Sequence, residues 1–220
     1  MRRTALIAAG ALVVVVLLLA IAQLMLPGIA AQSIRDRLSR SGRVLDVQVS
    51  AFPAIELLWH HADRVVVRMA SYHSNAPTLS SNLGQVGDVG TLDASANLFT
   101  TGLLTVRNAT LGKRGNELTA AATVTEADLR SSLPVLDSVQ PVASSNGEIT
   151  LQGTGTVLGV TATVDATVRP ENGALVVSPD APFGGLATIT VFSHPGIAVQ
   201  RVSAASAPGG FTLTAQATVR

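Results

Sequence analysis

The chain has 220 residues, enough for one ordinary domain and a short additional segment. Its 15 basic and 14 acidic residues leave a net charge of +1, which argues against a nucleic-acid-binding protein because such proteins need a basic face for phosphates. Since there is no cysteine, disulfides, thiol nucleophiles, thiolate zinc sites and a lipid-modified cysteine anchor are excluded.

The first segment along the chain, Ala5–Leu26, is apolar and carries no charge. As a helix its 22 residues would measure about 33 Å, enough to cross a hydrocarbon core of roughly 30 Å. We therefore expect an N-terminal transmembrane helix, with residues 1–30 as a membrane anchor or signal segment and residues 31–220 as the folded domain. The small residues Gly28–Ala31 leave a second interpretation open, in which the segment is a cleaved signal peptide.

The charges on the two sides of the apolar segment do not agree on its orientation in the membrane. Arg2 and Arg3 precede the apolar segment, but four arginines follow it between Arg35 and Arg43. The short basic N-terminus is typical of export signals and favours a cytoplasmic N-terminus. We accordingly expect a single-pass protein of the cell membrane with its domain on the extracytoplasmic side.

An amphipathic helix is predicted over residues 31–41. Ile34 and Leu38 share one face at a spacing of four, whereas arginines occupy the other face. Gly42 is a plausible helix stop. The arginines fit either lipid headgroups or solvent.

Most of the remaining chain alternates apolar and polar residues with a period of two, which predicts strands with one buried and one wet face. Turns rich in Gly, Asn and Pro separate these strands, so we expect an antiparallel sheet built from hairpins. The apolar positions include Leu45, Val47, Val49; Val65, Val67, Met69; Leu92, Ala94, Ala96, Leu98; Leu118, Ala120, Ala122, Val124; Ile149, Leu151; Val160, Ala162, Val164, Ala166, Val168; and Phe211, Leu213, Ala215, Ala217, Val219.

Two short helices interrupt the strands. Thr125 is a candidate cap for one helix, which Pro134 should kink or split. Pro53 suits the first turn of another, over residues 52–59. Residues 72–90 and 178–185 are expected to be loops. Together the elements predict an α+β fold, a long twisted antiparallel sheet wrapped around one or two helices.

The apolar strand positions hold mainly Ala, Gly and Val, and such small side chains leave space above the sheet. Either packed helices or a bound apolar ligand must fill that space.

Residues with catalytic or metal-binding chemistry do not form a recognisable motif. His60 and His61 are adjacent, with Asp63 nearby, but neighbours on a strand or helix point in different directions and make a poor metal site. We therefore expect no metal, no cofactor and no catalytic residues.

Several segments carry a resemblance. An apolar segment leads into an arginine-bearing helix and a strand, and residues 51–58 then read Ala-Phe-Pro-Ala-Ile-Glu-Leu-Leu. The segments 63–67, 118–129 and 147–151 follow. This order resembles the LmeA-like phospholipid-binding family of actinobacterial cell-envelope proteins, long catalogued as a domain of unknown function. Ala51 stands where the family usually has Gly, and residues 60–62 replace another common Gly.

The resemblance implies a fold similar to tubular lipid-binding domains, with a twisted antiparallel sheet around a helix and an apolar groove. It implies phospholipid and membrane as partners, no nucleic acid, and no enzymatic activity; it says nothing of protein partners. The expected function is phospholipid binding or transfer in cell-envelope biogenesis or maintenance. The candidates for contact with lipid, either in the groove or at the membrane, are the bulky apolar residues Phe52, Ile55, Leu58 and Trp59.

Two alternatives accompany this expectation. The chain could be a non-enzymatic envelope scaffold that binds a protein partner through a sheet edge or loops. It could also be an enzyme acting on glycans or lipids, which would need a carboxylate pair or a nucleophile in the groove.

Overall fold

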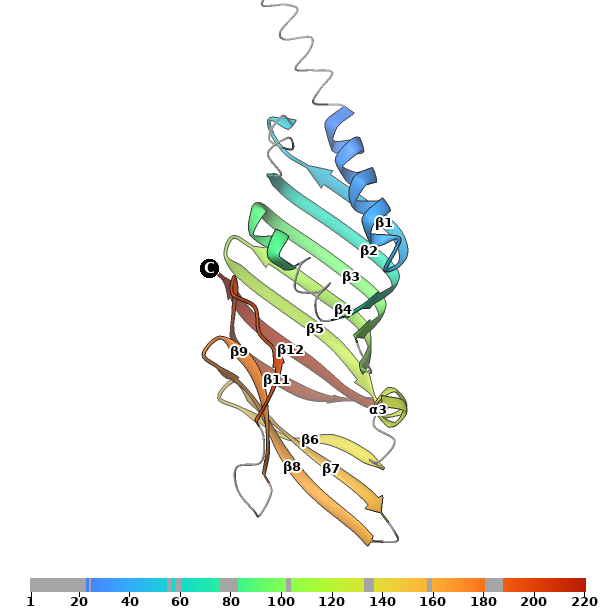
Figure 1. The fold of residues 1–220 in the computed structure, drawn as a ribbon, viewed down its shortest axis with the longest axis vertical. Coiled ribbons are helices and arrows are strands. Elements are labelled where there is room, and N and C mark those ends of the chain that lie inside the picture. The colour runs from blue at the N-terminus through green and yellow to red at the C-terminus, as the bar shows by residue number, and fades with distance from the viewer. Residues whose placement is uncertain are drawn as a thin grey trace, which may run out of the picture.

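The computed structural model describes residues 23, 25–54, 57, 61–75, 83–101, 104–132, 137–157, 160–180 and 188–220. These residues form a seven-stranded sheet in the order β1-β2-β3-β4-β5-β12-β11 and a five-stranded sheet in the order β10-β9-β8-β7-β6. The two sheets follow one another along the long axis of the molecule (Figure 1). The described chain is therefore β-rich with few helices, in agreement with the expected class.

The strands of the seven-stranded sheet are β1 (Gly42–Ser50), β2 (Ala62–Ser74), β3 (Val89–Thr101), β4 (Leu104–Arg114), β5 (Glu117–Thr125), β11 (Ile197–Ala207) and β12 (Gly210–Val219). Those of the five-stranded sheet are β6 (Ser138–Ser145), β7 (Glu148–Val157), β8 (Val160–Glu171), β9 (Ala174–Asp180) and β10 (Ile189–Phe192). Among the described residues, the main helical elements are residues 25–38, the 3₁₀ helix η2 (Gln85–Asp88) and α3 (Glu126–Ser132).

The predicted alternation decides which side chains face the core. On β2, Val65, Val67 and Met69 are buried, whereas Arg64 and Arg68 on the opposite face are exposed. Leu45 departs from the prediction, because 52% of its surface is exposed. The register of β1 against β2 shifts between Val44 and Asp46 and leaves Leu45 without a partner on β2, so a β-bulge turns Leu45 outward.

The expectation of a purely antiparallel sheet is wrong at one pair, because β2 and β3 run parallel. A parallel pair needs a crossover, and residues 75–88 supply it. Within this crossover Val86 of η2 is buried in the main core cluster. The expected loop 72–90 is therefore shorter than predicted, since β2 extends to Ser74 and β3 begins at Val89. Alternation defines faces but not strand direction, which is why the sequence did not show this.

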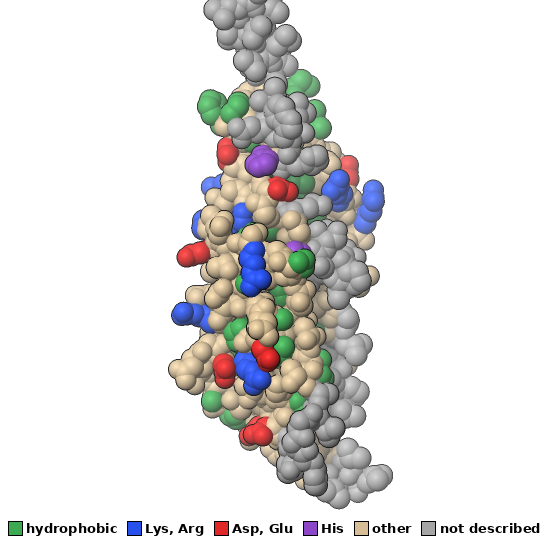
Figure 2. Space-filling model, turned by 60° about the vertical axis from the view of Figure 1, so that its left-hand side comes forward, with side chains coloured by type: hydrophobic (Ala, Val, Ile, Leu, Met, Phe, Trp, Pro, Cys, Tyr) green, Lys and Arg blue, Asp and Glu red, His purple; other side chains and the backbone are tan. Residues whose placement is uncertain are grey.

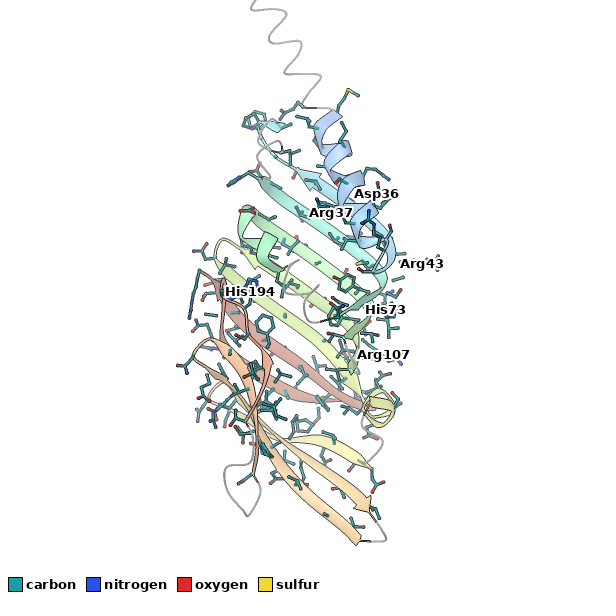
Figure 3. All side chains as sticks on the ribbon, viewed as in Figure 1. Asp36, Arg37, Arg43, His73, Arg107 and His194 are labelled. Carbon is teal, nitrogen blue, oxygen red and sulfur yellow. The ribbon has the colours of Figure 1, made fainter. Side chains whose placement is uncertain are left out.

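The N-terminal helix, residues 25–38, packs on the apolar face of the seven-stranded sheet. Ile34 and Leu38 contact the main core cluster, as predicted, and Ala30 and Ala31 extend the same face. Arg35 is exposed, and so is Arg37 (Figure 3). The helix ends at Leu38, before the predicted stop. Gly42 instead allows β1 to approach β2, because a Cβ there would lie 2.0 Å from the Ser71 carbonyl oxygen.

Helix α3 begins as predicted at Thr125, whose Oγ1 accepts a hydrogen bond of 3.2 Å from the Asp128 N–H. The Asp128 carboxylate in turn accepts two hydrogen bonds from Arg107 on β4, at 2.8 and 3.0 Å. Figure 3 labels Arg107. These hydrogen bonds lower the pKa of Asp128, while its burial opposes that effect. The pair therefore fixes α3 to the sheet.

The edge strand β11 joins the two sheets. Two turns of the five-stranded sheet accept hydrogen bonds from β11. The Gly147 carbonyl oxygen accepts one from the Val202 N–H and the Gly173 carbonyl oxygen accepts one from the Val199 N–H, both at 2.9 Å. Each of these glycines follows an Asn, and both residues of each turn have positive φ, as the predicted Asn-Gly hairpins require. Ile149, Val199 and Val202 form the core between the sheets.

Candidate functional site

One row of side chains crosses all seven strands on the inner, apolar face of the larger sheet. Its members are paired from strand to strand and are all aliphatic. In strand order they are Val47, Val67, Ala94, Leu111, Ala120, Ala215 and Val202. We call this set the apolar row.

Burial varies along the apolar row. The first two residues, Val47 and Val67, are buried in the core cluster that the N-terminal helix contacts, and the last, Val202, is buried between the sheets. The middle four, on β3, β4, β5 and β12, are only partly buried. Strands are spaced by about 4.8 Å, so these four positions form an apolar strip roughly 14 Å long. Three of its four residues are alanines, whose short side chains rise little above the sheet.

Lys113 lies in the neighbouring inner row, between Leu92 of β3 and Leu118 of β5. It is the chain's single lysine and only 3% exposed. Its ammonium donates hydrogen bonds to the carbonyl oxygens of Gly87, at 3.3 Å, and of Val89. Burial lowers the Lys113 pKa, and the charge of Asp88 opposes this shift. Lys113 thus holds η2 over the sheet beside the apolar row.

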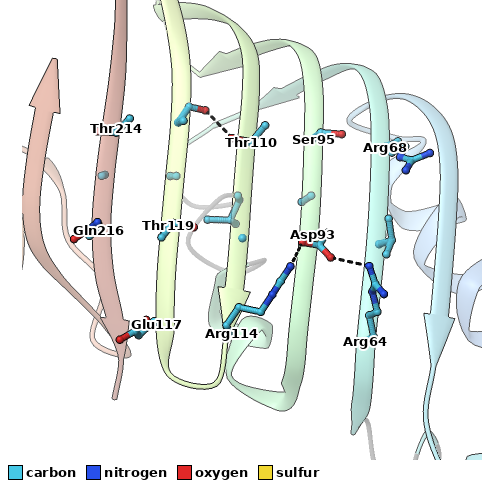
Figure 4. Close-up of a pocket in the computed structure, with 17 residues that line it drawn as sticks. Arg64, Arg68, Asp93, Ser95, Thr110, Arg114, Glu117, Thr119, Thr214 and Gln216 are labelled. Atoms are coloured by element: carbon cyan, nitrogen blue, oxygen red, sulfur yellow. Dashed lines mark hydrogen bonds and ion pairs between the residues drawn. The ribbon is translucent and has the colours of Figure 1, made fainter. Parts of the chain in front are cut away.

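The opposite face of the same sheet carries an open hollow of about 830 Å³ (Figure 4). At its centre Asp93 accepts hydrogen bonds from Arg114 at 2.6 Å and Arg64 at 3.2 Å. These bonds, chiefly that from Arg114, lower the pKa of Asp93. The remaining side chains on this face are mostly polar, from Arg68, Glu117, serine, threonine and glutamine, with Val66 and Ala121 among them.

Of the four site residues predicted from the sequence, the structure describes only Phe52. Phe52 is 80% exposed at the end of the molecule and does not line the apolar row. Ile55, Leu58 and Trp59 lie outside the described residues. Asp63, considered above as part of a metal site, accepts a 2.7 Å hydrogen bond from the Phe52 N–H. Among the residues with a defined position, no three His, Asp or Glu side chains gather to hold a metal.

Sequence reasoning missed both the register of the apolar row and the role of Lys113. Ala94, Ala120 and Ala215 were assigned to inward faces, but their alignment across strands depends on pairings that a single strand does not encode. Lys113 had a detectable signal, since it is the one lysine among 15 basic residues.

The fold and the apolar row define a β-rich domain whose larger sheet carries a continuous aliphatic row on its inner face. A family model described as LmeA-like phospholipid-binding matches residues 20–216, and the chain belongs to this family. The family is a lipid-binding family, not an enzyme family. Comparisons with curated proteins and with solved structures give no significant match.

The membrane anchor rests on the sequence alone. Over the part of the chain that the structure describes, no helix is both long and apolar enough to cross a bilayer. The segment predicted to do so falls almost entirely outside that part, within residues 1–22.

Proposed function

We propose that this chain is a membrane-anchored phospholipid-binding protein of the cell envelope, and that the apolar row is where acyl chains lie. The apolar row is the observation that carries the proposal. It is apolar from strand to strand, covered at both ends and partly open between them. An acyl chain on its middle part would replace water against Leu111 and the three alanines.

The energetics of such binding are favourable. Each buried methylene contributes about 0.8 kcal/mol, so a few chain segments suffice to offset the cost of ordering a lipid. Small side chains help, because an acyl chain can approach the sheet backbone closely where alanine stands.

The apolar N-terminal segment and the family support the proposed envelope location. Residues 5–26 carry no charge, and we propose that residues 1–30 anchor the domain of residues 31–220 on the extracytoplasmic side of the cell membrane. There it would bind phospholipid and transfer it during envelope biogenesis or maintenance. Membership of a lipid-binding family favours binding without catalysis.

A photoactivatable phospholipid tests the proposal. The full chain is reconstituted in liposomes that contain a phosphatidylcholine with a diazirine on one acyl chain, and crosslinked peptides are identified by mass spectrometry. We expect crosslinks to residues of the apolar row on β3, β4, β5 and β12. Crosslinks restricted to residues 1–30 would show that the domain does not hold lipid.

An envelope scaffold remains the second candidate, and one observation favours it. Ile189 and Val191 of β10 are 60% and 59% exposed, and β10 is an edge strand of the five-stranded sheet. An exposed apolar edge strand can pair with a partner's strand. Substituting Val191→Lys should abolish binding to a protein partner if this edge is used, without changing the phospholipid crosslinks.

A further inference from the structure

Three large apolar side chains are exposed at the end of the molecule where the N-terminal helix begins. Met25 and Ile29 are 60% and 61% exposed and lie one helical turn apart, on the same face. Phe52, in the turn after β1, is 80% exposed, the largest fraction among the exposed large apolar residues described. Hydrophobic side chains are visible at this end in the space-filling view (Figure 2).

The turn that carries Phe52 is fixed against the N-terminal helix. The Gln23 side-chain oxygen accepts a hydrogen bond of 2.7 Å from the Ala54 N–H, across 31 positions of sequence. Ala54 is fully buried, and the Phe52 N–H is bonded to Asp63 of β2. Phe52 therefore points outward from a turn that is held on two sides. We call the bond between Gln23 and Ala54 the Gln23 latch.

The sequence around the start of the helix is free of charge. No residue from Thr4 to Ile34 is charged. The first charge after the apolar segment is Arg35, ten residues or about 15 Å along the helix from Met25. Met25 thus lies at the end of an apolar segment long enough to span a bilayer, and Ile29 lies between that segment and the first charged side chain, Arg35.

We propose that Met25, Ile29 and Phe52 form a membrane-docking end that enters the lipid surface. This inference rests on the membrane anchoring in the proposed function and adds a second contact, through Phe52, from a different part of the chain. Phe52, Met25 and Ile29, beside the uncharged first turns of the helix, suit the boundary between headgroups and acyl chains. Two contacts would stop the domain from pivoting about its anchor and would hold the apolar row at a fixed orientation to the bilayer.

The absence of cysteine makes a direct test possible. Single variants Met25→Cys, Phe52→Cys and Ile189→Cys of the full chain are labelled with an environment-sensitive fluorophore. They are reconstituted in phosphatidylcholine–phosphatidylglycerol liposomes with lipids that carry a doxyl quencher near the headgroup. Position 25 reports the anchor, and Ile189 is a matched exposed apolar residue on the five-stranded sheet.

We expect at least twofold quenching at positions 25 and 52 and less than a tenth at 189. Quenching at 25 together with a signal at 52 no different from that at 189 would overturn docking. The outcome is independent of the lipid site: quenching at 52 without phospholipid crosslinks on the apolar row would support docking and contradict the proposed lipid site. Loss of quenching at position 25 would contradict the anchoring itself, and docking with it.

The Gln23 latch has its own variant. Gln23→Leu keeps a helix-forming side chain but removes the acceptor for the Ala54 N–H. We expect it to reduce quenching at position 52 by about half and to leave position 25 unchanged. Unchanged quenching at both positions would overturn the positioning role of Gln23.

Discussion

The Nζ atom of Lys113 donates a hydrogen bond of 3.3 Å to the carbonyl oxygen of Gly87, so a side chain of the sheet floor holds the short helix that crosses above it. A second bond, to the Val89 carbonyl, holds the point where η2 becomes β3. This arrangement explains why the charged Lys113 is buried between Leu92 and Leu118, in the row next to the apolar row. Backbone carbonyls take the place of water around its ammonium.

Replacing this lysine should release η2. In Lys113→Met the side chain keeps a similar length but both hydrogen bonds are lost. Hydrogen bonds to charged groups contribute about 1.5–3 kcal/mol, so exchange of the Val89 amide, which bonds the Val86 carbonyl, should be at least tenfold faster. Hydrogen exchange measured by mass spectrometry checks this. Unchanged exchange at residues 85–89 would contradict the role of Lys113.

Stability should also depend on pH through Lys113. Burial lowers its pKa in the folded protein, whereas the unfolded chain titrates near the ordinary value of 10.5. Between these two values the unfolded state binds more protons, so the free energy of unfolding rises as pH increases toward 10.5. The wild type should therefore gain stability relative to Lys113→Met between neutral pH and pH 10.5. Denaturant melts of both proteins across this range measure the difference, and parallel curves would contradict the prediction.

Filling the apolar row should block lipid binding. Ala120 lies between Leu111 and Ala215 on the inner face, and Ala121, the next residue of β5, faces the other side. Ala120→Trp would place an indole on the open strip, and we expect a fivefold or greater loss of phospholipid crosslinking in the domain. Ala121→Trp is the matched control, since it adds the same volume to the polar face. An equal effect of both substitutions would show that the apolar row is not the binding site.

The sequence predicted which side of the sheet each side chain faces better than it predicted which strands pair with one another. Alternation placed Val65, Val67 and Met69 in the core because a single strand determines which of its side chains share a side. The parallel pairing of β2 with β3 and the bulge at Leu45 depend on neighbouring strands, so neither was predictable from one strand's pattern. The apolar row has the same origin: Ala94 and Ala215 become parts of one site only through pairings across the sheet.

The attachment of α3 should weaken in acid. Hydrogen bonds from Arg107 lower the pKa of Asp128 below the ordinary 3.8, so its stabilising effect is full above 3.8 and is lost as pH falls through the lower, folded-state value. Asp128→Asn should therefore destabilise the protein at neutral pH, and the difference from wild type should shrink on acidification. Thermal melts at several pH values measure this, with Glu126→Gln as a control at an exposed carboxylate of the same helix. A difference that stays constant with pH would contradict the assignment.

The close pairing of β12 with β5 should not tolerate a side chain at Gly210. A Cβ at this position would lie 2.0 Å from the Val124 carbonyl oxygen, which is backbone and cannot move aside without shifting β5. Overpacking typically costs about 1–3 kcal/mol, so Gly210→Ala should lower the melting temperature by roughly 3–10 °C. Gly87→Ala is the control, because a Cβ there meets nothing within 4 Å, and it should change the melting temperature by about 2 °C or less. Since β5 and β12 carry Ala120 and Ala215, Gly210→Ala should reduce phospholipid crosslinking as well. An unchanged melting temperature of Gly210→Ala would contradict the prediction, because it would show that β5 and β12 can move apart without loss of stability.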